Sequence, residues 1–198
     1  MSKPLFFTHA CGFLFLLACH AGLPPDRYRA WVASNRESLT ATSAGDAIQT
    51  TLTYLPADWL AINEVGLGDP EKISSARGEY VGLEYYRLRV ALQSGQGDVL
   101  QHAAAGTDDY YQRIEYFSFG MQHDIRLLVG PDTLACKLYH FERNYGAAPY
   151  MDFMLGFETK PGSEFDRTLL YDDRVYSSGL IHLTIPFDNI HCIPTLQL

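Results

Sequence analysis

Residues 84–92 read Glu-Tyr-Tyr-Arg-Leu-Arg-Val-Ala-Leu, and this stretch decides the fold class. Its large apolar side chains fall on one side of an extended chain: Tyr86, Leu88, Val90 and Leu92. Arg87 and Arg89 fall on the other side. A period of two is the signature of a half-buried strand with one face toward a core and one toward solvent. The stretch therefore predicts a β-strand of an antiparallel sheet.

Further stretches have a strand-like composition, rich in β-branched, aromatic and other apolar residues: 47–55, 114–121, 124–129, 134–142, 151–158, 168–171 and 180–187. Turn sequences such as Gly130-Pro131-Asp132 and residues 160–163 separate some of them. Residues 66–78 and 94–109 read as loops. The sequence predicts a mainly β chain, folded as a single antiparallel β-sandwich or barrel-like domain.

Helix signals are confined to the N-terminal part of the chain. Asp26 can cap a helix whose apolar residues recur at helical spacing as far as Leu39. A short helical turn is predicted from Leu55 to Val65. The sequence therefore predicts one or two short helices near the N-terminus.

Residues 1–18 have the features of an export signal. Lys3 is followed by an apolar run from Leu5 to Leu17, which is shorter than the roughly 20 residues of a membrane-spanning helix. The alternatives are an ordinary cleaved signal and an uncleaved segment.

The end of this segment, Leu16-Leu17-Ala18-Cys19, resembles the lipobox of bacterial lipoproteins. The resemblance implies cleavage before Cys19, lipid on that cysteine and attachment to a membrane of the bacterial cell envelope. His20 stands where an aspartate retains such proteins in the inner membrane, so the resemblance favours the outer membrane. It divides the chain into a signal peptide (1–18), a lipid-anchored tether with a short helix (19–45) and a β-rich domain (46–198).

The net charge of the chain limits the kinds of partner that it can bind. The chain has 15 Lys and Arg residues against 23 Asp and Glu residues, a net charge of −8. Removal of residues 1–18 takes only Lys3 from this balance, so the mature chain carries −9. An acidic domain lacks the basic footprint that nucleic-acid binding needs, so no nucleic-acid partner is expected.

Cys136 and Cys192 are the cysteines that remain after cleavage and lipidation. The envelope is an oxidising compartment, where two cysteines can form a disulfide. The alternative, which the sequence leaves open, is two separate buried thiols.

His140 and Glu142 are the strongest candidates for chemistry. In a strand over 134–142 they share the face of Leu134, Cys136 and Leu138 and lie at its rim. A histidine and a carboxylate two residues apart on a strand could act as an acid/base pair or as two zinc ligands. The structural alternative is that both reach solvent or that Glu142 pairs with an arginine. His123 and Asp124 form a second, weaker pair.

Two further groups are candidates for binding. The acidic pairs 108–109 and 172–173 offer oxygen ligands for calcium, with solvated turns as the alternative. No cofactor is predicted beyond these zinc and calcium candidates.

Tyrosine pairs place one ring on each face of a strand, so some rings face outward unless a second layer covers them: Tyr85, Tyr86, Tyr110 and Tyr111.

The chain as a whole resembles uncharacterised β-rich envelope lipoproteins of Gram-negative bacteria. The resulting hypothesis is a membrane-anchored, non-catalytic module that binds or assembles another envelope protein. The first alternative is an envelope hydrolase or metal-dependent enzyme using His140 and Glu142. The second is a glycan-binding module.

Overall fold

The computed structural model describes residues 22–160 and 162–198. The predicted signal peptide and Cys19 lie outside these residues. The fold is mixed α/β, with 34% strand and 30% helix, and its two antiparallel sheets are not closed into a barrel. The prediction of antiparallel sheets is confirmed. The prediction of a mainly β chain with helices only near the N-terminus is wrong.

Five strands form the larger sheet, in the order β1-β2-β3-β7-β6. Their bounds are β1 (Thr40–Ala44), β2 (Ile48–Leu55), β3 (Glu84–Leu92), β7 (Tyr150–Phe157) and β6 (Leu138–Glu142). Strand β3 occupies the centre and has the bounds that the alternation predicts. Its apolar face is buried, with Tyr86 and Leu88 both 0% exposed.

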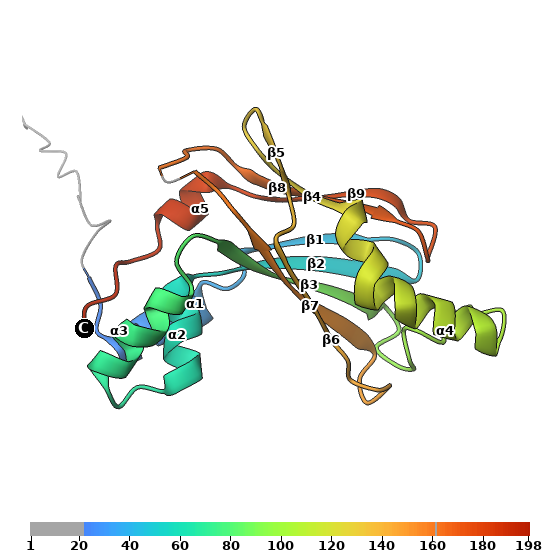
Figure 1. Cartoon of the computed structure of the whole chain (residues 1–198), viewed down its shortest axis with the longest axis horizontal. Helices are drawn as coiled ribbons and strands as arrows, with labels where there is room; N and C mark the ends of the chain where they lie inside the picture. Colours follow the sequence, from blue (N-terminus) through green and yellow to red (C-terminus); the bar gives the residue numbers. More distant parts are fainter. Residues whose placement is uncertain (1–21, 161) are drawn as a thin grey trace, which may run out of the picture.

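Four strands form the smaller sheet, in the order β5-β4-β8-β9. Their bounds are β5 (Asp132–Ala135), β4 (Ile125–Val129), β8 (Arg167–Asp173) and β9 (Gly179–Ile185). Figure 1 shows this sheet stacked on the five-stranded one. The main core lies between them and draws fully buried residues from both, including Leu88 and Phe153 below and Leu127 and Leu169 above.

Three helices form a second, smaller core at one end of the molecule (Figure 1): α1 (Pro25–Ser34), α2 (Ala57–Val65) and α3 (Pro70–Glu79). Helix α3 occupies most of the stretch 66–78, for which the sequence predicts a loop. Asp69 caps it by accepting hydrogen bonds from the amides of Glu71 and Lys72, and Pro70 takes the first helical position. Its buried Ile73 supplies the packing that a solvated loop lacks.

Residues 107–124 are also helical, in place of the strand predicted over 114–121 and the end of the loop predicted over 94–109. They form α4 (Thr107–Glu115), the π-helix η1 (Tyr116–Gly120) and the 3-10 helix η2 (Met121–Asp124). Ile114, Phe117 and Met121 recur at helical spacing and pack on the main core. A short apolar run fits either element, and here the helical period is the one that buries it. A fifth helix, α5 (Phe187–His191), follows β9.

The strand predicted over 134–142 is divided between the two sheets. Strand β5 belongs to the smaller sheet and β6 to the larger one, and the chain passes between them at residues 136–137. A strand that changes sheets makes a corner and breaks the period of two. Tyr139 and Phe141 therefore pack on the core, whereas His140 and Glu142 are exposed. The predicted inward face of this strand is wrong.

The described part of the stretch predicted as a tether with a short helix, residues 22–45, packs on the rest of the domain. Leu23 donates its amide hydrogen to the carbonyl of Thr195 at 2.8 Å. Tyr28 in α1 is 1% exposed, and β1 pairs with β2 along its whole length. The folded domain therefore begins by residue 23, because the N-terminal helix and strand both bury surface against later elements.

Candidate functional site

The predicted pairs of histidine and carboxylate do not assemble into one site. His140 and Glu142 are exposed on the edge strand β6, and His123 is exposed in η2. The Asp124 carboxylate accepts hydrogen bonds from the Tyr116 hydroxyl at 3.0 Å and from Arg174 at 2.9 Å. Within residues 22–160 and 162–198, no three His, Cys, Asp or Glu side chains are placed to hold a metal ion.

Cys136 is a free, half-buried thiol, so the predicted disulfide with Cys192 is not formed in this structure. Its Sγ donates to the carbonyl of Leu138 at 2.9 Å, within the corner that joins the two sheets. Burial raises the pKa of Cys136 to about 11, because a thiolate is poorly solvated there.

Alkylation of Cys136 in the folded protein is expected to be slow at pH 8. The raised pKa leaves roughly a hundredfold fewer thiolates than an ordinary cysteine has at that pH. Mass spectrometry after iodoacetamide treatment measures the rate, and the same protein in urea provides the control. A native mass two hydrogens lower, with no alkylation until a reductant is added, would instead show a disulfide and contradict the free thiol.

Three of the four predicted calcium ligands bind other groups of the chain. Asp109 accepts from Arg113, and Asp172 lies 3.1 Å from Arg174. Asp173 accepts the amide hydrogens of Val175, Tyr176 and Ser178 at 2.9–3.1 Å, which closes the turn between β8 and β9.

Three of the four candidate tyrosines are covered. Tyr86 is in the main core, and its neighbour Tyr85 is buried on the opposite face of the strand beneath α2, with Leu60. Tyr110 is half-buried and only Tyr111 is exposed, at 63%. A second layer therefore covers most of the rings that were candidates for binding.

The outer face of the five-stranded sheet carries two ordered rows of side chains, of which all but Met154 are polar. One row runs through Thr42, Thr51, Arg89, Asp152 and Glu142. The other runs through Thr40, Thr53, Arg87, Met154 and His140. Threonine hydroxyls meet within each row, at 3.3 Å for Thr42 and Thr51 and 3.1 Å for Thr40 and Thr53. We call these ten residues the threonine–arginine face.

A pocket of about 530 Å³ lies on part of this face, between the sheet and the end of α1. The lining is Arg36, Glu37, Thr40, Thr42, Thr51, Thr53, Arg87 and Arg89. We call it the arginine hollow. Arg89 is neutralised by Asp152 through two hydrogen bonds of 2.7 and 2.6 Å, and its guanidinium lies 3.6 Å from the Tyr150 ring centre. Arg87 is half-buried and makes no hydrogen bond or ion pair with any described residue.

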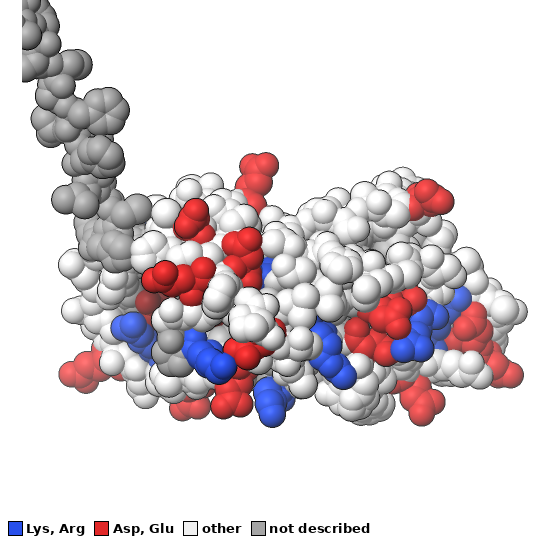
Figure 2. Space-filling model, turned by 90° about the horizontal axis from the view of Figure 1, so that it is seen from above, with Lys and Arg blue, Asp and Glu red and all other residues white. Residues whose placement is uncertain are grey.

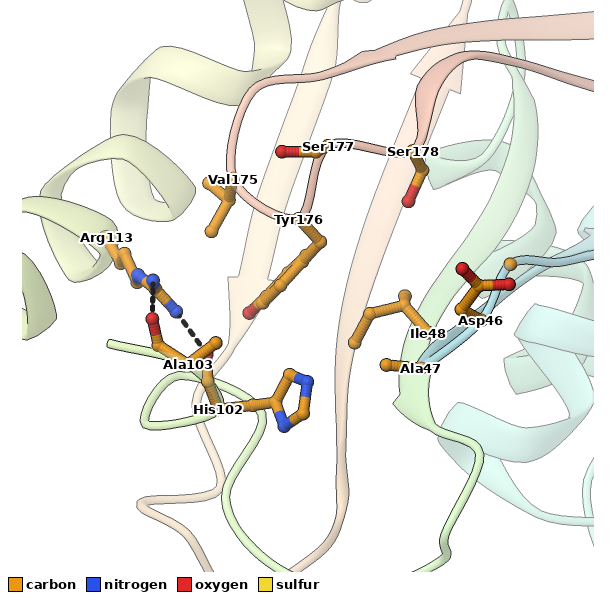
Figure 3. A pocket seen from close by; sticks show the side chains of 11 residues that line it. Asp46, Ala47, Ile48, His102, Ala103, Arg113, Val175, Tyr176, Ser177 and Ser178 are labelled. Carbon is orange, nitrogen blue, oxygen red and sulfur yellow. Dashed lines mark hydrogen bonds between the residues drawn. The ribbon is translucent and has the colours of Figure 1, made fainter. Parts of the chain in front are cut away.

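A second cavity, of about 500 Å³, lies where three loops meet at the end of the sheets (Figure 3). The β1–β2 turn, the loop before α4 and the β8–β9 turn contribute its lining, and we call it the loop pocket. Arg113, 8% exposed, fixes one wall, because all five of its N–H groups are used. Two bind the Asp109 carboxylate, and the others bind the carbonyls of Leu100, His102 and Ala103.

The loop pocket also contains unusual backbone and unused polar groups. Ala103 and Ser177 have positive φ angles of 53° and 60°, which cost energy in a residue with a side chain. Asp46, the His102 ring and the Ser177 hydroxyl line the pocket, and none of these side chains makes a hydrogen bond with a described residue. In Figure 3 the His102 ring lies below the Tyr176 ring.

The stability of the β8–β9 turn is expected to depend on the ionisation of Asp173. Burial alone would raise the pKa of this carboxyl, but the three amide hydrogen bonds outweigh it and lower the pKa below its usual value of 3.8. The stabilisation that a lowered pKa provides is fully present at pH values above the ordinary pKa of the carboxyl. It is lost as the pH falls through the pKa of the folded state.

Asp173→Asn should therefore destabilise the protein at pH 7 by roughly 2 kcal/mol, and its deficit should shrink near pH 3. Urea unfolding at both pH values measures this, with Asp172→Asn as the control because that side chain is 48% exposed. A deficit that is equal at both pH values would contradict the assignment.

A scan against protein-family models, a search of curated proteins and a search of solved structures found no match to this chain. Within the described residues, no helix is long and apolar enough to span a membrane. Figure 2, which views the molecule from the side of the four-stranded sheet, shows acidic and basic side chains interspersed without a continuous basic surface.

Proposed function

We propose that this protein is a membrane-anchored lipoprotein of the bacterial envelope that binds another envelope protein without catalysing a reaction. The observation that carries the proposal is the threonine–arginine face. It offers hydroxyl groups and guanidinium groups in fixed register on a sheet, with Thr42, His140 and Glu142 exposed. Arginine is enriched in protein interfaces, because its rigid fork binds carboxylates and carbonyls at low entropic cost.

The lipid anchor of this proposal holds the α1–α3 end of the molecule near a membrane. Cys19, the residue that the lipobox resemblance assigns to lipid, precedes Leu23 by four residues. A chain of that length spans roughly 14 Å at most. Leu23 lies beside the C-terminal residues at the α1–α3 end of the molecule (Figure 1). The anchored domain is therefore held close to the bilayer by this end, with both sheets extending away from it.

The anchor is tested by labelling cells with a fatty-acid analogue. Cys19→Ser should abolish labelling and release the protein from the membrane fraction, whereas Cys11→Ser should leave both unchanged. Labelling that persists in Cys19→Ser, or is lost in Cys11→Ser, would contradict the proposed cleavage and lipidation site.

The binding role is tested by chemical crosslinking in living cells, identification of the captured protein, and reconstitution from two purified components. The proposal expects a stoichiometric complex in analytical ultracentrifugation. It also expects that complex to form unchanged with the double variant His123→Ala/Asp124→Asn, which alters a candidate pair away from the threonine–arginine face. Failure of the purified proteins to associate would contradict the proposal.

A glycan-binding role is the second candidate, and the loop pocket favours it. Asp46, His102 and Ser177 present unused donors and acceptors to a cavity whose walls are held by Arg113 and Asp173. Hydroxyl-rich ligands bind such groups, and loops held on a rigid scaffold are common places for binding sites. Titration with fragments of envelope polysaccharide should give saturable binding that His102→Ala weakens. No binding at millimolar fragment concentration would remove this candidate.

We do not propose a catalytic role for His140 and Glu142. Both are exposed on an edge strand, and the described residues do not gather a third ligand around them.

A further inference from the structure

We infer that the arginine hollow is an anion-binding site and that its ligand is an acidic segment of the partner protein. This inference rests on the proposed binding function and names the chemistry of the group that the partner inserts.

The two arginines of β3 provide an internal comparison. Arg89 lies opposite Asp152 of β7 in the strand register, and Arg87 lies opposite Met154 of the same strand. Both guanidinium groups project from the central strand onto the same face. The Asp152 carboxylate binds Arg89 through two hydrogen bonds, whereas the Met154 thioether stands opposite Arg87. Arg87 therefore lacks the planar acceptor that its neighbour has.

A half-buried guanidinium without a counter-charge is costly to the folded protein. It loses part of its hydration and gains no ion pair in return. A carboxylate from outside, held as Asp152 holds Arg89, would supply the missing pair and exclude the remaining water. Arg87 is therefore poised for a ligand rather than for a contact within the chain.

The charge of the lining favours an acidic ligand. Arg36, Arg87 and Arg89 face the hollow, with Glu37 as the single acidic residue among the eight that line it. Asp152 neutralises Arg89, which leaves Arg36 and Arg87 without a described ion-pair partner. This concentration of positive charge stands out in a chain whose net charge is −8. An acidic segment would be attracted to the hollow and repelled by much of the remaining surface.

Two of the four threonine hydroxyls that line the hollow offer no hydrogen to a bound anion. Thr40 donates its hydroxyl hydrogen to the carbonyl of Arg36 at 2.8 Å, so in the 3.1 Å contact with Thr53 it is Thr53 that donates. Neither hydroxyl then has a hydrogen left for an anion. A phosphate group has three oxygens to satisfy, whereas a carboxylate needs the single fork of Arg87. The Arg87 fork therefore matches a planar carboxylate, and one hydroxyl hydrogen of the Thr42–Thr51 pair remains beside it.

The inference is tested with a fluorescent, capped peptide rich in glutamate and a matched peptide in which glutamine replaces every glutamate. Anisotropy should show that the glutamate peptide binds the purified domain, that the glutamine peptide does not, and that added salt weakens the binding. Arg87→Met should weaken it at least roughly tenfold, because loss of a charge-assisted pair is worth that much. Arg126→Met provides the control, since Arg126 lies on the outer face of the four-stranded sheet.

A stability measurement separates a ligand-binding role of Arg87 from a structural one. Arg87→Met should leave the urea midpoint unchanged or raise it, because it removes an uncompensated half-buried charge. Three results would overturn the inference: no difference between the two peptides, equal loss in Arg87→Met and Arg126→Met, or complete displacement by inorganic phosphate at concentrations at which acetate has no effect. The last result would reassign the hollow to a phosphate ligand. These outcomes are independent of whether the partner complex forms, which tests the proposed function.

Discussion

Arg167→Ala is expected to destabilise the protein by roughly 3–5 kcal/mol, because it leaves a buried carboxylate without its partner. Arg167 begins β8 in one sheet and Glu84 begins β3 in the other. The Arg167 side chain is 5% exposed and that of Glu84 15%. Two hydrogen bonds of 3.1 and 2.7 Å join them, and the Tyr86 hydroxyl donates to the same carboxylate at 2.7 Å. The pair connects the sheets at one end of the core.

Urea unfolding of Arg167→Ala measures this effect. The double variant Arg167→Met/Glu84→Leu should recover much of the loss, because apolar residues of similar size avoid the desolvation cost of a buried pair. Lys160→Ala provides the surface control. The Lys160 side chain is 78% exposed, so its ion pair with Asp132 should contribute little to stability. A loss in Arg167→Ala no larger than that control would contradict the buried ion pair.

Arg113→Ala is expected to cost roughly 3 kcal/mol and to open one wall of the loop pocket. The substitution removes five hydrogen-bond donors at once, three of them directed at backbone carbonyls of the loop before α4. Hydrogen exchange should accelerate in residues 98–106 more than in the central strand β3, since that loop is held by the arginine side chain.

Arg113→Lys is the informative companion of this variant. It keeps the positive charge but loses the planar fork, so it should recover only part of the stability. Full recovery in the lysine variant would show that charge alone holds the loop and would contradict the role of the five directed hydrogen bonds.

The core of the larger sheet could be predicted from local patterns. In β3 the alternation of Leu88 and Val90 with Arg87 and Arg89 gives both the bounds and the buried face, because a strand in the middle of a sheet is constrained on both sides. The same alternation placed the two arginines on the outward face.

The corner at Cys136 and the helix around Phe117 could not be predicted in this way. A stretch that crosses between sheets pairs in one register with the first sheet and in another with the second. No single alternation of buried and exposed residues therefore describes Leu134 to Glu142. The run 114–121 has the composition of a strand, and its helical packing depends on a core assembled from distant strands. Tertiary burial overrides local preference in both places.

The candidate sites depend on contacts that are distant in the sequence. Arg36 reaches the arginine hollow from the end of a helix, about fifty residues before Arg87. The acidic pairs at 108–109 and 172–173 can be found in the sequence, but their contacts cannot. Asp109, Asp172 and Asp173 bind Arg113, Arg174 and backbone amides, which no spacing in the sequence identifies.

The most direct test of the proposed binding surface is site-specific photo-crosslinking in living cells, with the reactive amino acid at Thr42 or at Thr184. Both are exposed threonines on edge strands, and each contacts a threonine on the neighbouring strand. Thr42 lies on the threonine–arginine face and Thr184 on the outer face of the other sheet. The proposal expects an adduct with the same envelope protein at position 42 and none at position 184. An adduct at 184, or none at 42, would contradict the assignment of the binding surface.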